Sequence, residues 1–264
     1  MQTVTSKDGT VIAYEKTGSG PVLILVGGAF QDHNGLAAHA ALLAEKFTVF
    51  NYDRRGRGES GNNEPYAVER EIEDIAALIQ AAGGEAYVFG GSSGAVLALD
   101  AAAANVGITK LALYEPPFVV DDSRPAAPEK FADKLREMIA EGRRGDAAEA
   151  FMVQGANMPA EVVAGMRKAP FWEPGVEAVA HTLVHDALIM EGTMTGRPLP
   201  DSRWKSVTIP TTVLAGGNSP DWMKAGSKAL VKLLPAAQSE LVEGQAHDVS
   251  AEALAPMLVA CLQS

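Results

Sequence analysis

The sequence predicts an α/β fold, in which a mostly parallel β-sheet is flanked by helices and carries one helical insertion. Short runs rich in β-branched residues alternate with longer segments rich in Ala, Leu and Glu, as strands alternate with crossover helices in such sheets. This alternation stops between about residues 116 and 200, where the chain is helix-like and interrupted by prolines. The length of 264 residues suits one α/β domain with an insertion.

The first strands are predicted at residues 2–6 and 11–16, and the Asp8-Gly9 pair between them is a hairpin signal. An antiparallel start to the sheet follows. Residues 22–26 are apolar throughout, which is typical of a strand covered on both faces, and residues 47–52 form the next such run.

The remaining elements of the core follow the same alternation. Residues 68–82 have apolar side chains at helical spacing, and residues 93–104 are rich in Ala and Leu. The other ranges predicted are strands at 86–90, 110–114, 211–215 and 239–242, and helices at 221–234 and 251–262.

The insertion is predicted to be a helical cap. Its candidate helices are residues 128–142, 146–156, 160–168 and 175–191. We therefore divide the chain into a core made of residues 1–116 and 201–264 and a cap made of residues 117–200.

Composition excludes several classes of partner. The formal net charge of −11 argues against nucleic acid and anionic membranes, which both require clustered Lys and Arg. Cys261 is the only cysteine, so neither an internal disulfide nor a Cys-based zinc site can form. No apolar run approaches a membrane span and the N-terminus lacks a signal-peptide pattern, so we expect a cytoplasmic protein that binds a small molecule. The oligomeric state cannot be read from the sequence.

The strongest motif is Gly90-Gly91-Ser92-Ser93-Gly94, which follows a predicted strand and opens a predicted helix. In a nucleophile elbow of the form G-x-S-x-G, a tight turn exposes the serine hydroxyl, and small residues two before and two after the serine permit the turn. The motif predicts Ser92 as nucleophile. Ser93 is a rival, because Gly91 and Ala95 would flank it, and a plain Gly/Ser loop is the structural alternative.

An oxyanion hole is expected beside this serine. If Ser92 is the nucleophile, the Ser93 amide supplies one donor, and the loop after residues 22–26 supplies the second. We assign the second donor to Ala29. We expect Gly28, Phe30, His33 and Trp172 to contact substrate; an ordinary flexible turn is the alternative for the loop.

His247 follows the last predicted strand, at the edge where ligand sites of α/β proteins form. A histidine there can accept the serine proton and return it to a leaving group. His181 and His185 stand four residues apart and could face a metal together, but Asp186 alone does not complete a ligand set. Packing of a cap helix is the better interpretation of that pair, and no metal is expected.

Together these landmarks resemble the α/β-hydrolase superfamily over essentially all of the chain outside the cap. They are Gly27-Gly28, residues 53–60 (Asp-Arg-Arg-Gly-Arg-Gly-Glu-Ser), the Ser92 turn and the final Gly-x-x-His. The resemblance implies an α/β-hydrolase fold with a mostly parallel, eight-stranded sheet, and a serine hydrolase that needs no cofactor. In this family residues 53–60 are a landmark turn that need not touch substrate.

The sequence departs from the family pattern where the acid of a Ser-His-acid triad usually lies. After the seventh strand the resemblance predicts Gly-x-x-Asp, but Gly216-Gly217-Asn218-Ser219 places an uncharged serine there. Two carboxylates can replace it. Glu115 ends the sixth strand, an arrangement that some family members resemble, and Asp221 lies two residues late; we favour Glu115.

The expected reaction is hydrolysis of a small ester, lactone or thioester through an acyl-enzyme on Ser92. The alternatives are a lyase, cyclase or cofactor-free perhydrolase on the same fold, and a catalytically silent binder of a small molecule. Met and aromatic side chains of the cap could line an apolar pocket, although most are expected to pack its helices.

Overall fold

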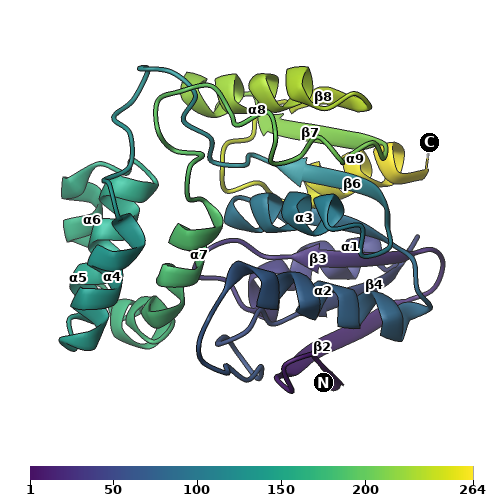
Figure 1. Cartoon of the computed structure of the whole chain (residues 1–264), viewed down its shortest axis with the longest axis horizontal. Coiled ribbons are helices and arrows are strands. Elements are labelled where there is room, and N and C mark those ends of the chain that lie inside the picture. The colour runs from purple at the N-terminus through teal and green to yellow at the C-terminus, as the bar shows by residue number, and fades with distance from the viewer. Residues whose placement is uncertain (264) are drawn as a thin grey trace.

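The computed structural model describes residues 1–263, and its centre is one eight-stranded sheet (Figure 1). The strand order is β1-β2-β4-β3-β5-β6-β7-β8. The strands are β1 (Gln2–Thr5), β2 (Val11–Gly18), β3 (Val22–Val26), β4 (Thr48–Tyr52), β5 (Ala86–Gly91), β6 (Ile108–Tyr114), β7 (Thr211–Gly216) and β8 (Ala237–Val242). The predicted α/β-hydrolase fold is confirmed.

The sheet begins with the predicted antiparallel hairpin and continues parallel. β1 pairs antiparallel with β2, and β2 pairs antiparallel with β4. All pairings from β4 to β8 are parallel. Val22–Val26 is almost wholly buried because helices cover both faces of the sheet at β3, as its continuous apolar run predicts.

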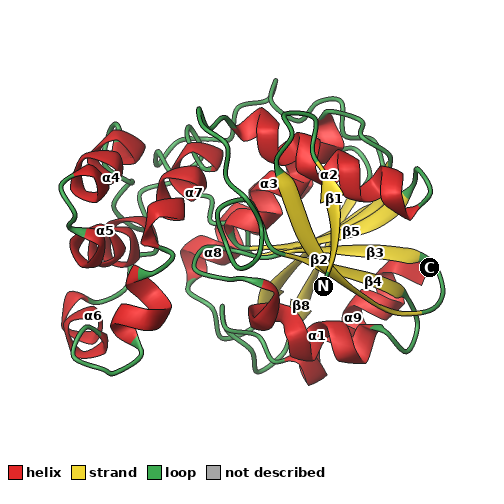
Figure 2. Cartoon of the chain, turned by 90° about the horizontal axis from the view of Figure 1, so that it is seen from below, coloured by secondary structure: helices red, strands yellow, loops and turns green. Residues whose placement is uncertain are grey.

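Helices lie on both sides of the strands, and the core is divided accordingly (Figure 2). α1 (Ala37–Leu43) and α9 (Ala251–Gln263) share one apolar cluster with one face of the sheet. α2 (Val68–Ala82), α3 (Ser93–Ala103) and α8 (Asp221–Leu233) share the larger cluster on the other face. Among residues 1–263, no helix combines the length and the apolar character needed to cross a bilayer.

The chain between β6 and β7, called here the β6–β7 segment, gathers beyond one end of the sheet (Figures 1 and 2). Its elements are α4 (Phe131–Ala140), α5 (Arg144–Ala150), the π-helical turns η2 (Phe151–Gly155) and η3 (Trp172–Glu177), α6 (Ala160–Met166), the 3-10 turn η4 (Ala180–Thr182) and α7 (Leu183–Ile189). α7 contacts both α2 and α3, so it joins the segment to the sheet layers.

The two ends of this segment meet. Val119 forms a parallel bridge with Met194, and the Val119 amide donates to the Thr193 carbonyl. The Gly196 amide donates to the Val119 carbonyl. The chain therefore leaves the sheet layers and returns to them through one narrow neck.

One predicted helix is wrong. Residues 175–191 were expected to form a single helix, but they contain the end of η3, the turn η4 and the short helix α7. Inside the break the Thr182 hydroxyl donates to the Val179 carbonyl, a local side-chain bond that competes with regular helix. Residues 146–156 likewise change from α5 to the π-helical turn η2 at Phe151.

Candidate active site

Ser92 lies at the junction of β5 and α3 with a backbone that few non-glycine residues adopt, φ 55° and ψ −126°. Its amide donates to the Tyr114 carbonyl at the end of β6, 2.9 Å away. The turn therefore lifts the Ser92 side chain above the carboxyl ends of the two central strands.

Glycines make this turn possible by close backbone approach. A Cβ atom at Gly94 would lie 2.4 Å from the Val26 carbonyl oxygen, and one at Gly90 would lie 2.5 Å from the Gly94 carbonyl oxygen. A Cβ at Gly28 would lie 3.0 Å from the Ser92 Cβ. A side chain at 94 would push the elbow away from the end of β3, and one at 90 would push the start of α3 away from β5. This is why the G-x-S-x-G pattern requires small residues at both positions.

His247 lies between Ser92 and Glu115. Its Nε2 atom is 3.2 Å from Ser92 Oγ, and its Nδ1 atom is 2.7 Å from Glu115 Oε2. The Tyr114 hydroxyl donates to the Ala246 carbonyl and so fixes the loop that carries the imidazole. The structure thus brings together an alcohol, an imidazole and a carboxylate from three distant parts of the chain.

Glu115 is fully buried, and each of its carboxylate oxygens has a donor. Oε1 accepts the Gly216 amide at 2.7 Å, while Oε2 faces the imidazole. The Glu115 amide in turn donates to the Leu214 carbonyl. A carboxylate held in this way is fixed in place by β7 and is kept from water.

The alternative acid is far more exposed. The Asp221 side chain is 98% exposed and forms an ion pair with Lys224 at 3.2 Å. Ser219, where the family pattern places an aspartate, is buried, and its hydroxyl has no hydrogen-bond partner among residues 1–263. Of the two carboxylates left open by the sequence, the structure brings only Glu115 to the imidazole.

Two backbone amides lie beside Ser92 without an acceptor among the described residues. Ser93 is the first residue of α3, so its amide has no partner within the helix. The Ala29 amide also has none, whereas the Gly28 amide donates to Gln31 Oε1 at 2.8 Å. These are the two amides predicted from the sequence as oxyanion donors.

A cavity of about 290 Å³ opens on Ser92 and His247, and a pocket of about 30 Å³ adjoins it. Most of the side chains that line the two are apolar or aromatic: Phe30, Leu36, Phe89, Phe151, Met152, Met158, Met190, Trp222, Met223, Val249 and Leu254. No Lys, Arg or Glu is among the residues that line either one.

Only some of the predicted substrate contacts line this cavity. Gly28 and Phe30 do, and the Phe30 ring meets Phe151 edge to face at 5.7 Å. His33 lies outside the lining, with Nδ1 2.9 Å from Asp53 Oδ1. Trp172 also lies outside it, because its buried indole N–H donates to Glu177 at 2.7 Å within the β6–β7 segment.

The His181 and His185 pair does not converge on a shared ligand position. His181 Nε2 lies 2.9 Å from the Gly56 carbonyl, while the His185 ring stacks on Tyr66 with centroids 3.7 Å apart. Burial lowers the pKa of His185 to about 4, so the ring is neutral at pH 7. Asp32, His33 and Asp53 do group their ligand-type atoms, and Asp53 already accepts hydrogen bonds from the His33 and Glu59 amides.

Sequence reasoning missed other groups around the cavity. His39 lines the cavity beside Val249, and burial lowers the pKa of its imidazole. Gln31 lines it too while it binds the Gly28 amide. Proximity to the Gly27-Gly28 loop was the one signal that could have found Gln31.

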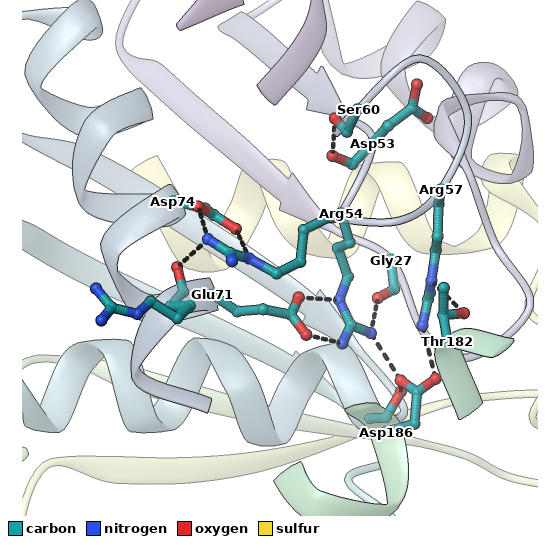
Figure 3. A network of polar contacts seen from close by, with 12 residues as sticks. Gly27, Asp53, Arg54, Arg57, Ser60, Glu71, Asp74, Thr182 and Asp186 are labelled. Atoms are coloured by element: carbon teal, nitrogen blue, oxygen red, sulfur yellow. Dashed lines mark hydrogen bonds and ion pairs between the residues drawn. The ribbon is translucent and has the colours of Figure 1, made fainter. Parts of the chain in front are cut away.

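A buried cluster of four charges adjoins the site, made of Arg54, Arg57, Glu71 and Asp186 (Figure 3). Arg54 binds Glu71 through two hydrogen bonds of 2.7 and 2.8 Å, and it also donates to Asp186 at 2.8 Å. Arg57 donates to Asp186 at 2.6 Å. Burial favours the neutral acid, yet the two guanidinium groups hold the pKa of Asp186 below its usual value.

Known proteins show what this chain resembles. A model of the alpha/beta hydrolase family matches residues 22–257. The crystal structure of an alpha/beta hydrolase from Sphaerobacter thermophilus DSM 20745 has 52% sequence identity and a TM-score of 0.92, with 99% of this chain and 100% of that chain covered. A thermophilic esterase from Thermogutta terrifontis has 23% identity and a TM-score of 0.73, with 99% and 97% covered, which shows a shared fold.

A shorter match is found with an uncharacterized hydrolase, YraK, from Bacillus subtilis. The two are 42% identical over 96 residues, which span only 35% of this chain and 35% of that relative. The family model, by contrast, spans most of the present sequence. The chain therefore belongs to the alpha/beta hydrolase family.

Proposed function

We propose that this protein hydrolyses small, apolar carboxylic esters through an acyl-enzyme on Ser92. The observation that carries the proposal is the continuous contact from Ser92 Oγ to His247 at 3.2 Å and from His247 to Glu115 at 2.7 Å. Membership of the alpha/beta hydrolase family supports hydrolysis as the reaction class.

Proton transfer follows from the two faces of the imidazole. With Nδ1 protonated toward Glu115, Nε2 is free to accept the Ser92 proton as Oγ attacks the ester carbonyl. The imidazolium then gives that proton to the departing alkoxide, and the alcohol leaves. Water repeats the cycle on the acyl-enzyme, releasing the acid and restoring Ser92. Glu115 keeps its hydrogen bond to Nδ1 throughout and stabilises the imidazolium.

The Ala29 and Ser93 amides are assigned as the hydrogen-bond donors that stabilise the negative charge developing on the carbonyl oxygen. Donors that are already oriented lower the barrier because they need no reorganisation during the reaction. Removal of one such donor typically costs about 10²–10³-fold in kcat.

The substrate class is proposed from the lining and the size of the cavity. Its lining is mostly apolar, it includes no Lys or Arg that could pair with a substrate carboxylate, and a volume of about 290 Å³ suits a small molecule. Uncharged esters of short acids are therefore proposed ahead of anionic substrates. The β6–β7 segment, which contributes Phe151, Met152 and Met158 to the lining, is proposed to act as a cap.

Ser92→Ala tests the proposal. Hydrolysis of p-nitrophenyl acetate and butyrate should fall by about 10⁴-fold or more, because the variant lacks the hydroxyl that is proposed to form the acyl-enzyme. A fluorophosphonate probe should label the parent once, on Ser92, as read by mass spectrometry of the peptides.

Ser227→Ala is the matched control, since Ser227 is also a buried serine and does not line the cavity. It should keep both the rate and the label. Full activity in Ser92→Ala, or a label on another residue, would reject the acyl-enzyme mechanism.

A further inference from the structure

We infer that Arg57 is a positioning residue that aims the Ala29 amide into the oxyanion hole, and that Asp186 on α7 holds Arg57 in place. The inference rests on the proposed function and assigns a task to a residue of the 53–60 turn that the reaction itself leaves unused. No carbonyl group of a substrate needs to touch Arg57.

The argument begins with one peptide bond. The Gly28 carbonyl and the Ala29 amide belong to the same planar, trans peptide unit, so they point in opposite directions. Arg57 Nη1 donates to the Gly28 carbonyl oxygen at 2.5 Å. The hydrogen bond that turns this oxygen toward the protein interior therefore turns the Ala29 N–H the other way, toward the cavity that Ala29 lines.

This restraint acts on the peptide itself, while the rest of the loop is held by the Gly28 amide, which donates to Gln31 Oε1, and by Arg57 Nη1, which also donates to the Gln31 carbonyl at 3.2 Å. A Cβ at position 28 would lie only 3.0 Å from the Ser92 Cβ, which favours glycine there, and glycine leaves the backbone free to rotate. The neighbouring Phe30 already lies in the left-handed region with φ 64°. A rotated Gly28–Ala29 peptide would direct a carbonyl dipole at the developing negative charge in place of an N–H.

Asp186 and Thr182 immobilise the guanidinium itself. Arg57 Nη2 donates to Asp186 at 2.6 Å, and Nε donates to the Thr182 hydroxyl at 3.1 Å (Figure 3). Both acceptors come from the β6–β7 segment, at η4 and α7. The Arg57 guanidinium is planar, and because all three of its nitrogens donate hydrogen bonds, it is held in one orientation.

Asp186 also reaches the second amide donor. The Ser93 hydroxyl donates to Asp186 Oδ1 at 2.7 Å, and Ser93 supplies the other proposed oxyanion amide. The fully buried Asp186 carboxylate therefore accepts hydrogen bonds from Arg57, which orients the Ala29 amide, and from Ser93, which supplies the other amide. The oxyanion hole has its geometry only while α7 is seated on the sheet layers.

Arg57→Gln tests the inference, after ester hydrolysis by the parent and its loss in Ser92→Ala have been verified. We expect kcat for p-nitrophenyl acetate to fall about 10–100-fold, less than for outright loss of a donor, while KM changes by less than about threefold. Affinity for a trifluoromethyl ketone, whose adduct carries an oxyanion, should fall by the same factor as kcat.

Arg55→Gln is the matched control. Arg55 is the neighbouring buried arginine and pairs with Asp74 and Asp8, but its hydrogen bonds reach neither Gly28 nor Asp186. Its replacement removes a comparable ion pair, so stability should fall while kcat per fluorophosphonate-titrated site is kept. Equal kcat losses in the two variants, or a loss confined to KM in Arg57→Gln, would overturn the inference.

If Arg57→Gln does not fold, as judged by circular dichroism, Arg57→Lys and Arg55→Lys carry the same comparison. Lysine keeps the charge and can reach one acceptor, but it cannot hold three acceptors in a plane. Arg57→Lys should lose about 3–10-fold in kcat, and Arg55→Lys should lose none. Absence of ester cleavage by the parent would instead reject the proposed function.

Discussion

Three residues around the cavity are not glycine and yet have left-handed backbone angles: Phe30, Ser92 and Glu115, with φ of 64°, 55° and 46°. Each such angle costs on the order of 1 kcal/mol, and strained residues of this kind concentrate at functional sites. The surrounding contacts hold them there. At Glu115, for instance, the amide donates to Leu214 while the carboxylate binds Gly216.

The position of Glu115, the proposed acid of the triad, leads to a prediction. Glu115→Gln should lower kcat by about 10³–10⁴-fold, because a neutral amide neither stabilises the imidazolium nor fixes its tautomer. Asp221→Asn should remain within about twofold of the parent, since that side chain is 98% exposed and pairs only with Lys224. Steady-state ester hydrolysis at pH 8 measures both. Similar losses in the two variants would contradict the assignment.

The parts of the site that could be predicted from the sequence are those whose local motif requires a particular backbone geometry. The strand–turn–helix context predicted that Ser92 is presented at a sheet edge, and the final Gly-x-x-His predicted a second group at that edge. The choice between Glu115 and Asp221 stayed open, because it depends on how far the loop after β7 reaches. Arg57 and Asp186 meet across 129 residues, and no local pattern encodes such a contact.

At the scale of elements, the elbow makes a prediction about stability. Gly94→Ala places a Cβ 2.4 Å from the Val26 carbonyl oxygen, so α3 or β3 must shift; the free energy of unfolding should fall by about 2 kcal/mol. Gly91→Ala is the control, because the nearest atom to its added Cβ, Phe89 Cζ, is 3.8 Å away. Gly91→Ala should change stability by less than about 0.5 kcal/mol. Urea unfolding of both variants gives the comparison, and equal stability of the two would contradict it.

Strong periodicity made some elements predictable, and interrupted periodicity made others unpredictable. The apolar spacing of residues 68–82 gave the bounds of α2, Val68–Ala82, correctly. In contrast, residues 175–191 are helix-like in composition but break at η4. At that break the Thr182 hydroxyl accepts a hydrogen bond from Arg57 Nε, and a contact with so distant a part of the chain cannot be predicted from local helix propensity.

At the scale of the whole molecule, stability should depend on pH through His185. The imidazole is buried and faces Tyr66, and the charges of Glu71, Asp186, Arg54 and Arg57 surround it. Its pKa is lowered from 6.5 to about 4 by burial. Between pH 6.5 and about pH 4, His185 is protonated in the unfolded chain but not in the folded chain. The free energy of unfolding therefore decreases as the pH is lowered through this range.

His185→Phe should remove this loss while it preserves the ring stack. Between pH 7 and pH 4.5 the parent should lose about 2 kcal/mol more of its free energy of unfolding than the variant does. Urea midpoints at the two pH values measure the difference. The same pH dependence in parent and variant would show that other groups are responsible.

The fold itself was the most predictable property. Alternating strands and helices, the Asp8-Gly9 hairpin and the buried β3 run agree with one another, and the sheet has the antiparallel start and mostly parallel remainder that they predict. The division into core and cap at residues 117 and 200 remains a prediction. The path of the chain between β6 and β7 follows from side-chain packing that composition does not specify.

The neck at Val119 and Met194 has a consequence for recombining this protein with its relatives. Because the chain leaves and re-enters at one point, a foreign module can be grafted between residues 120 and 193 while Glu115 stays on the recipient side of the joint. The module must bring its own counterpart of the carboxylate on α7. A chimera that lacks one would leave Arg54 and Arg57 without the carboxylate that both bind, and we expect it to turn ester over slowly.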